Sequence, residues 1–113
     1  KRTEKRYILN TLIPELISLY GGYIMQIVQY KASLSDIPLA ILTRNDLDDY
    51  ERALFYKQRQ GIEKRYNDMY EAGTLTIIEY NYDPVVNPEA HDPVADMLRG
   101  GDVLWRREEN INE

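Results

Sequence analysis

The sequence predicts an α+β fold that is mostly helical, on three observations. Apolar residues recur at spacings of three or four through two long stretches, side chains then alternate over residues 74–82, and three pairs of Asp or Asn with Pro follow. The predicted elements are a broken N-terminal helix, a long central helix, a short edge strand, an extended proline-spaced arm and a short C-terminal helix.

Residues 3–31 are predicted as a helix with a break. Pro14 either lies in the first turn of a helix capped by Thr11 or kinks an earlier one, and the pair Gly21-Gly22 offers a second break. Residues 23–30 are also rich in β-branched and aromatic side chains, which favours a strand as the alternative. The helix is preferred because the apolar spacing continues through Ile8, Leu12, Leu16, Leu19, Tyr20, Tyr23, Ile24, Ile27 and Val28.

The central helix is predicted over residues 43–72, after a linker at 31–38 and a short apolar run at 37–42. Thr43 and Asp46 have the spacing of a capping pair, and Gly73 follows the last turn. An apolar arc predicts the core stripe of this helix: Leu47, Leu54, Phe55, Ile62, Tyr66 and Met69. Glu51, Gln58 and Arg65 project into or beside that arc, which is more typical of an interface than of a dry core.

Residues 74–82 are predicted as an edge strand, because isoleucines, threonines and tyrosines alternate there. One strand cannot satisfy its own edges. The candidate partners within the chain are residues 23–30 and 103–105, and otherwise the partner strand belongs to another chain.

The pairs Asp83-Pro84, Asn87-Pro88 and Asp92-Pro93 predict an extended arm over residues 83–93. Asp92 then caps a short helix that Gly100-Gly101 ends. The expected organisation is a helical core domain with its edge strand at residues 1–82. Residues 83–113 supply the arm, the short helix and a charged tail, either in the same domain or docked on a neighbour.

Composition limits the function. The 113 residues suit one globular domain, and the absence of cysteine excludes disulfides, thiol nucleophiles and cysteine-ligated zinc. Basic residues outnumber acidic ones five to two in residues 1–31, whereas acidic residues lead eight to three in residues 83–113. Nucleic acid is therefore not an expected partner. Polar and breaker residues within 7–30 argue against a membrane span. The chain starts at Lys1, which suggests a trimmed protein or a fragment, and an intracellular or virion-associated setting is favoured.

Two clusters of acidic residues have the composition of a metal or catalytic site. Glu89, His91, Asp92 and Asp96 could ligate a metal ion or supply an acid and a base. Asp46, Asp48, Asp49 and Glu51 resemble a divalent-ion site only by number. Helix capping explains both clusters better, so no catalytic residue, metal site or cofactor is predicted.

Ten tyrosines against one phenylalanine indicate surfaces made for contact, because tyrosine combines an apolar ring with a polar tip. The sequence therefore predicts a non-enzymatic structural or adaptor subunit of a larger assembly, such as a virion or organellar complex. Its partners are other protein subunits, copies of itself included. The predicted contact residues are Tyr56, Tyr66, Tyr70, Tyr80, Tyr82 and Trp105. The alternative is a small acidic inhibitor or regulator of a basic partner.

Overall fold

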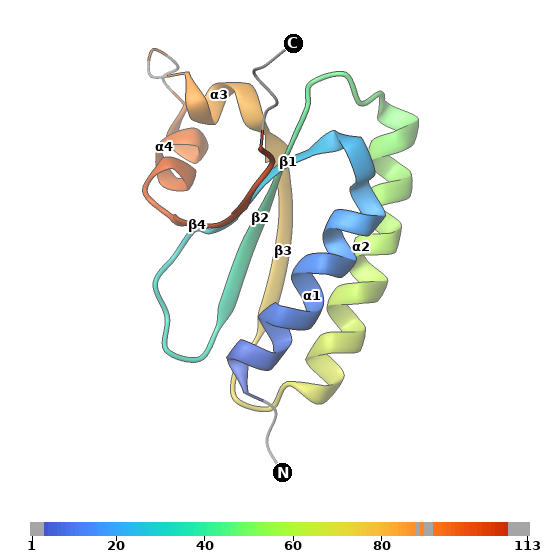
Figure 1. The fold of residues 1–113 in the computed structure, drawn as a ribbon, viewed down its shortest axis with the longest axis vertical. Helices are drawn as coiled ribbons and strands as arrows, with labels where there is room; N and C mark the ends of the chain where they lie inside the picture. Colours follow the sequence, from blue (N-terminus) through green and yellow to red (C-terminus); the bar gives the residue numbers. More distant parts are fainter. Residues whose placement is uncertain (1–3, 88, 90–91, 109–113) are drawn as a thin grey trace.

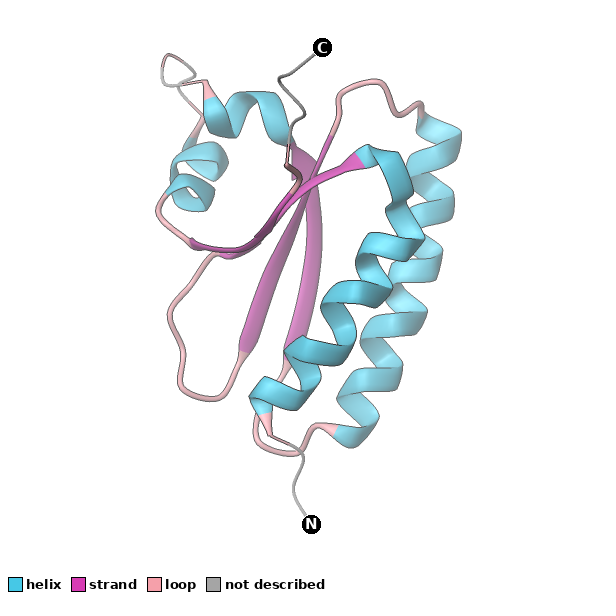
Figure 2. Ribbon diagram, in the orientation of Figure 1, coloured by secondary structure: helices cyan, strands magenta, loops and turns pink. Residues whose placement is uncertain are grey.

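The computed structural model describes residues 4–87, 89 and 92–108, and in them four strands form one mixed sheet with helices on both faces (Figures 1 and 2). The order of the strands is β3-β2-β1-β4. The elements in chain order are α1 (Lys5–Tyr20), the 3-10 turn η1 (Gly21–Tyr23), β1 (Ile24–Gln29), β2 (Ile37–Thr43), α2 (Asp49–Met69), β3 (Leu75–Asn81), α3 (Tyr82–Val86), α4 (Pro93–Arg99) and β4 (Asp102–Arg106).

The sheet separates two apolar cores, which makes the fold a three-layer α/β/α arrangement. The helices α1 and α2 lie side by side on one face, and α3 and α4 cover the other (Figure 1). The larger core joins α1 residues such as Leu12 and Leu16 to Leu39 and Ile77 of the sheet. The smaller core joins Leu42 to the short helices. Both faces of the sheet are therefore buried, which accounts for its apolar central strands.

The strand directions place the carboxyl ends of three strands at the same end of the sheet. β2 and β3 are parallel and are connected through α2, while β1 runs antiparallel to both β2 and β4. The carboxyl ends of β2, β3 and β4 therefore meet beside the start of β1. In open α/β sheets, ligands commonly bind at the end of the sheet where the carboxyl ends of the strands lie.

The preferred helix at residues 23–30 is wrong, because Ile24–Gln29 form strand β1. The expected break at Gly21-Gly22 is confirmed: Gly21 ends α1 with a φ of 58°, a conformation that glycine adopts without strain. Ile27 and Val28 are both buried although they point to opposite cores. Because both faces of this strand are buried, most of its residues are apolar, and such a run fits the pattern of a helix as well as that of a strand.

The central helix is present but starts later than predicted. α2 spans Asp49–Met69, so it also ends before Gly73, and Thr43 is the last residue of β2, a strand in a segment predicted only as an apolar run. The cap is Asp48, which accepts a hydrogen bond from the Glu51 backbone while the Glu51 side chain accepts one from the Asp48 backbone. All seven residues of β2 are buried, so no alternation marked it as a strand.

The predicted core stripe of α2 is only partly correct. Phe55, Ile62 and Tyr66 pack on the core, but the side chains of Leu54 and Met69 are exposed. Arg59, which no pattern singled out, is buried instead. The helix therefore faces the core through a mixed apolar and charged stripe.

The edge strand β3 is confirmed, but its partner is β2, which was not among the candidates. Its outer edge is covered by side chains of α2. Asn67 exchanges two hydrogen bonds with the backbone of Leu75, at 2.8 and 2.9 Å, and Glu63 accepts one from the amide of Ile77 at 2.7 Å. These hydrogen bonds satisfy the outward backbone groups of Leu75 and the amide of Ile77 within the chain.

The extended arm at residues 83–93 is wrong over its first part, since Tyr82–Val86 form α3. Residues 88, 90 and 91 lie outside the described part. The short C-terminal helix is confirmed: Asp92 accepts a hydrogen bond from the Val94 amide at 2.9 Å, and Gly100 follows Arg99. Residues 102–106 then form β4, which pairs with β1 in the same sheet.

Candidate functional site

The six aromatic residues predicted to contact a partner do not form one surface. Tyr56 is 53% exposed on α2, whereas Tyr66 and Tyr70 are buried in the larger core. Tyr80 and Tyr82 pack from the opposite face of the sheet, against the smaller core. Trp105 is half-buried on β4. Their role in binding stays a prediction, and only Tyr56 offers most of its ring to a partner.

The hydroxyl groups of the buried tyrosines Tyr66 and Tyr70 form hydrogen bonds within the chain. The Tyr66 hydroxyl donates to Glu15 at 3.1 Å, and the Tyr70 hydroxyl donates to the carbonyl of Ser35. Burial, together with the bond to Glu15, raises the pKa of Tyr66 to about 12. Part of the tyrosine excess therefore serves to connect α1, α2 and the loop before β2.

The outer face of α2 carries apolar side chains that the core does not use. Tyr50 is 72% exposed and Leu54 is 45% exposed. They are four residues apart and so adjacent on the helix surface. Lys57 and Gly61 continue the same row. We call Tyr50, Leu54, Lys57 and Gly61 the α2 outer row.

A buried ionic network joins α2 to β3 and to the end of α1. The Glu79 carboxylate accepts hydrogen bonds from Arg52, from Arg59 at 3.1 Å and from the Tyr20 hydroxyl at 2.7 Å. The Glu79 and Arg59 side chains are only 9% and 10% exposed. Tyr20 also stacks on Phe55, with ring centroids 4.3 Å apart. Burial and the neighbouring Glu79 raise the pKa of Tyr20 above its ordinary value. Since every member is paired, the network fixes the packing of these elements.

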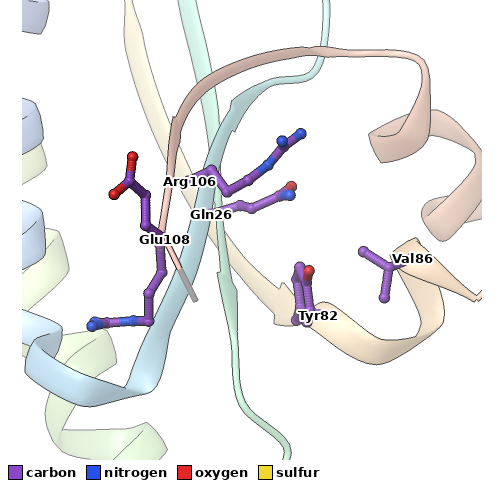
Figure 3. A pocket seen from close by; sticks show the side chains of 6 residues that line it. Gln26, Tyr82, Val86, Arg106 and Glu108 are labelled. Atoms are coloured by element: carbon purple, nitrogen blue, oxygen red, sulfur yellow. The ribbon is translucent and has the colours of Figure 1, made fainter. Parts of the chain in front are cut away.

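A hollow of about 550 Å³ lies beside β1 and β4, at the carboxyl ends of the strands (Figure 3). Its lining residues are Gln26, Tyr82, Val86, Arg106, Arg107 and Glu108. Gln26 and Arg106 are cross-strand neighbours, and Figure 3 shows their side chains next to each other. Tyr82 and Val86 face them from α3, whereas Glu108 lies on the other side of β4 in this view.

The two arginines that line this hollow, Arg106 and Arg107, differ in their contacts. Arg107 donates to the backbone carbonyls of Ile24 and Gly21, at 2.9 and 2.6 Å, and its guanidinium lies 5.7 Å from the Trp105 ring. By contrast, the Arg106 guanidinium makes no hydrogen bond or ion pair with any residue in the described ranges, and only the backbone of Arg106 is paired, in the β1–β4 ladder. No sequence pattern pointed to Gln26 or Arg106, because they lie 80 positions apart in the sequence.

The acidic clusters have structural uses. Asp48 and Glu51 form the capping box of α2, and Asp46 pairs with Arg44 at 2.6 Å. Asp92 caps α4 and Asp96 pairs with Arg99. His91 lies outside the described residues. Within those residues, no group of three or more His, Asp or Glu side chains is placed to hold a metal ion.

None of the helices in the described part combines the length and the apolar character that crossing a bilayer requires. Comparison with protein-family models, with curated proteins and with solved structures gives no match for this chain.

Proposed function

We propose that this chain is a non-enzymatic structural or adaptor subunit of a larger protein assembly, and that it contacts a neighbouring subunit through the α2 outer row. The observation that carries this proposal is the exposure of Tyr50 and Leu54 on the helix face opposite the core. A tyrosine beside a leucine gives a contact with a polar tip and an apolar body. Such a row suits an apolar groove on the partner.

The position of the row strengthens the proposal. The opposite face of α2 is fully used, by the core residues Phe55, Ile62 and Tyr66 and by the network of Arg59 and Glu79. Tyr56 lies on a flank, where Gln60 donates to its hydroxyl at 2.8 Å and the Arg59 guanidinium lies 5.4 Å from its ring. Tyr56 therefore offers a second exposed contact on α2, apart from the outer row, and its held ring lowers the entropy lost on binding.

The alternative of an acidic inhibitor has less support. Three acidic side chains of the C-terminal third are already engaged: Asp83 accepts from Asn45 at 2.6 Å, Asp92 caps α4 and Asp96 pairs with Arg99. Engaged carboxylates contribute less to binding a basic partner.

The test is co-purification of partners with the tagged chain from its native source. Leu54→Lys and Tyr50→Lys should each remove the same co-purifying subunit, without changing the thermal unfolding of the isolated chain. Tyr7→Lys is the matched control, since Tyr7 is an exposed tyrosine on α1. The proposal fails if the chain is recovered alone as a monomer, or if the α2 variants retain every partner.

A further inference from the structure

We propose that the hollow lined by Gln26, Tyr82, Val86 and Arg106 binds a small molecule that carries one phosphate or carboxylate group on a planar apolar body. This site is separate from the α2 outer row, and the inference does not depend on the proposed assembly role.

Gln26 is the first argument. The residue is only 7% exposed, and its side-chain amide makes no hydrogen bond within the described residues. A buried amide without a partner costs stability. Among the described residues, no side-chain nitrogen or oxygen is both closed to solvent and unbonded. The amide of Gln26 must therefore reach the open volume of the hollow, where a ligand can bond it.

Arg106 supplies the charge. It is the cross-strand neighbour of Gln26, so the two side chains share one face of the sheet. A guanidinium without an acidic partner binds a carboxylate or a phosphate through two parallel hydrogen bonds. The adjacent amide donates to the same group or accepts from a neighbouring one. The pair thus recognises an oxyanion and the atoms next to it.

The opposite wall suits the remainder of the ligand. Tyr82 and Val86 face the polar pair from α3, as Figure 3 shows, and they present an aromatic ring and an aliphatic side chain. A planar ligand body can stack on the ring of Tyr82. The side chain of Tyr82 is half-buried, and α3 fixes its backbone directly after β3.

The charge balance limits the ligand to one anionic group. Glu108 also lines the hollow, and Arg107 is bonded to the carbonyls of Ile24 and Gly21. One cation, Arg106, therefore remains for the ligand, which matches a single anionic group. The volume of about 550 Å³ is within the usual range for sites of small molecules.

The place in the fold agrees with this role. The hollow lies where the carboxyl ends of β2 and β4 flank the start of β1, the end of the sheet at which ligands bind in open α/β sheets. Two parts of the wall, β1 and β4, belong to the rigid sheet. They fix the backbone positions from which Gln26 and Arg106 extend toward the hollow.

The experiment is an NMR titration of the full chain that follows the side-chain amide of Gln26 and the Nε–H of Arg106. The probes are phenyl phosphate and benzoate, with benzyl alcohol as the neutral analogue. We expect saturable shifts of both signals with at least one anion, and the comparison of the two anions assigns the phosphate or the carboxylate class. Benzyl alcohol should bind at least about tenfold more weakly, since a charge-assisted hydrogen bond is lost.

Two variants and a control decide the outcome. Arg106→Gln, at an exposed position that leaves the core intact, should weaken anion binding at least about tenfold. Gln26→Leu keeps a similar volume and should weaken it less. Arg6→Gln removes the same charge from the exposed face of α1 and should leave binding unchanged. The proposal is overturned if neither anion shifts these signals, if benzyl alcohol binds as well, or if Arg6→Gln weakens binding as much as Arg106→Gln.

Discussion

The Tyr20 hydroxyl donates a 2.7 Å hydrogen bond to the carboxylate of Glu79, which joins the last residue of α1 to the edge strand of the sheet 59 positions later. Arg59 contacts both groups from α2. Three elements therefore depend on one carboxylate for their relative positions.

Replacement of Glu79 by alanine should be strongly destabilising, because it leaves the buried Arg59 guanidinium without its counter-charge. The expected loss is about 3–5 kcal/mol in the free energy of unfolding, measured by urea denaturation. Asp68→Ala is the control, since its pair with Lys64 is exposed on α2 and should cost under about 0.5 kcal/mol. Equal costs for the two variants would contradict a structural role for the network.

The chain should lose stability in alkaline solution above about pH 10. The pKa values of Tyr20 and Tyr66 are raised in the folded chain, that of Tyr66 to about 12, whereas the unfolded tyrosines titrate near their ordinary pKa of 10.0. The stabilisation that these two tyrosines contribute is fully present below about pH 10 and is lost as the pH rises toward their pKa values in the folded chain. The melting temperature should fall over this range.

Tyr20→Phe and Tyr66→Phe should each flatten this alkaline decline, since phenylalanine does not titrate. The exposed Tyr50→Phe is the control and should leave the slope unchanged. A decline of the same steepness in all three variants would show that other groups cause it.

Two glycines should respond oppositely to alanine. A Cβ at Gly61, inside α2, meets no atom within 4 Å, so Gly61→Ala should stabilise the chain by about 0.5–1 kcal/mol. A Cβ at Gly73 would lie 2.5 Å from the carbonyl oxygen of Ser35, so Gly73→Ala should destabilise it. Thermal denaturation of both variants distinguishes the cases, and a stabilised Gly73→Ala would rule out this close backbone approach.

Asp48→Ala should cost about 1 kcal/mol in unfolding free energy, because it removes the hydrogen bond that caps α2 at the Glu51 amide. Asp49→Ala changes the next carboxylate without touching the cap and should cost less. If the two alanine variants lose the same stability, the N-terminus of α2 is stabilised by negative charge near the helix dipole and not by the capping hydrogen bond of Asp48.

Local patterns predicted the elements that local contacts define. The alternation of β3, the cap and glycine stop of α4 and the broad extent of α2 were all visible, because each depends on residues a few positions apart. For β1 the strand was only the alternative to a preferred helix, and β2 was predicted as no more than an apolar run, since burial on both sheet faces removes the alternation that marks a strand. The helical backbone at Asp83 and Pro84 also differed from the extended preference before proline.

The sequence by itself determined a mixed helix and strand chain without cysteine, rich in tyrosine, in which Asp92 and Gly100 mark the two ends of α4. Only the tertiary structure decided which tyrosines are buried and which side chains meet. The Glu79 network and the pairing of Gln26 with Arg106 join residues 20 to 80 positions apart. Such contacts follow from strand order and register, which no local spacing encodes.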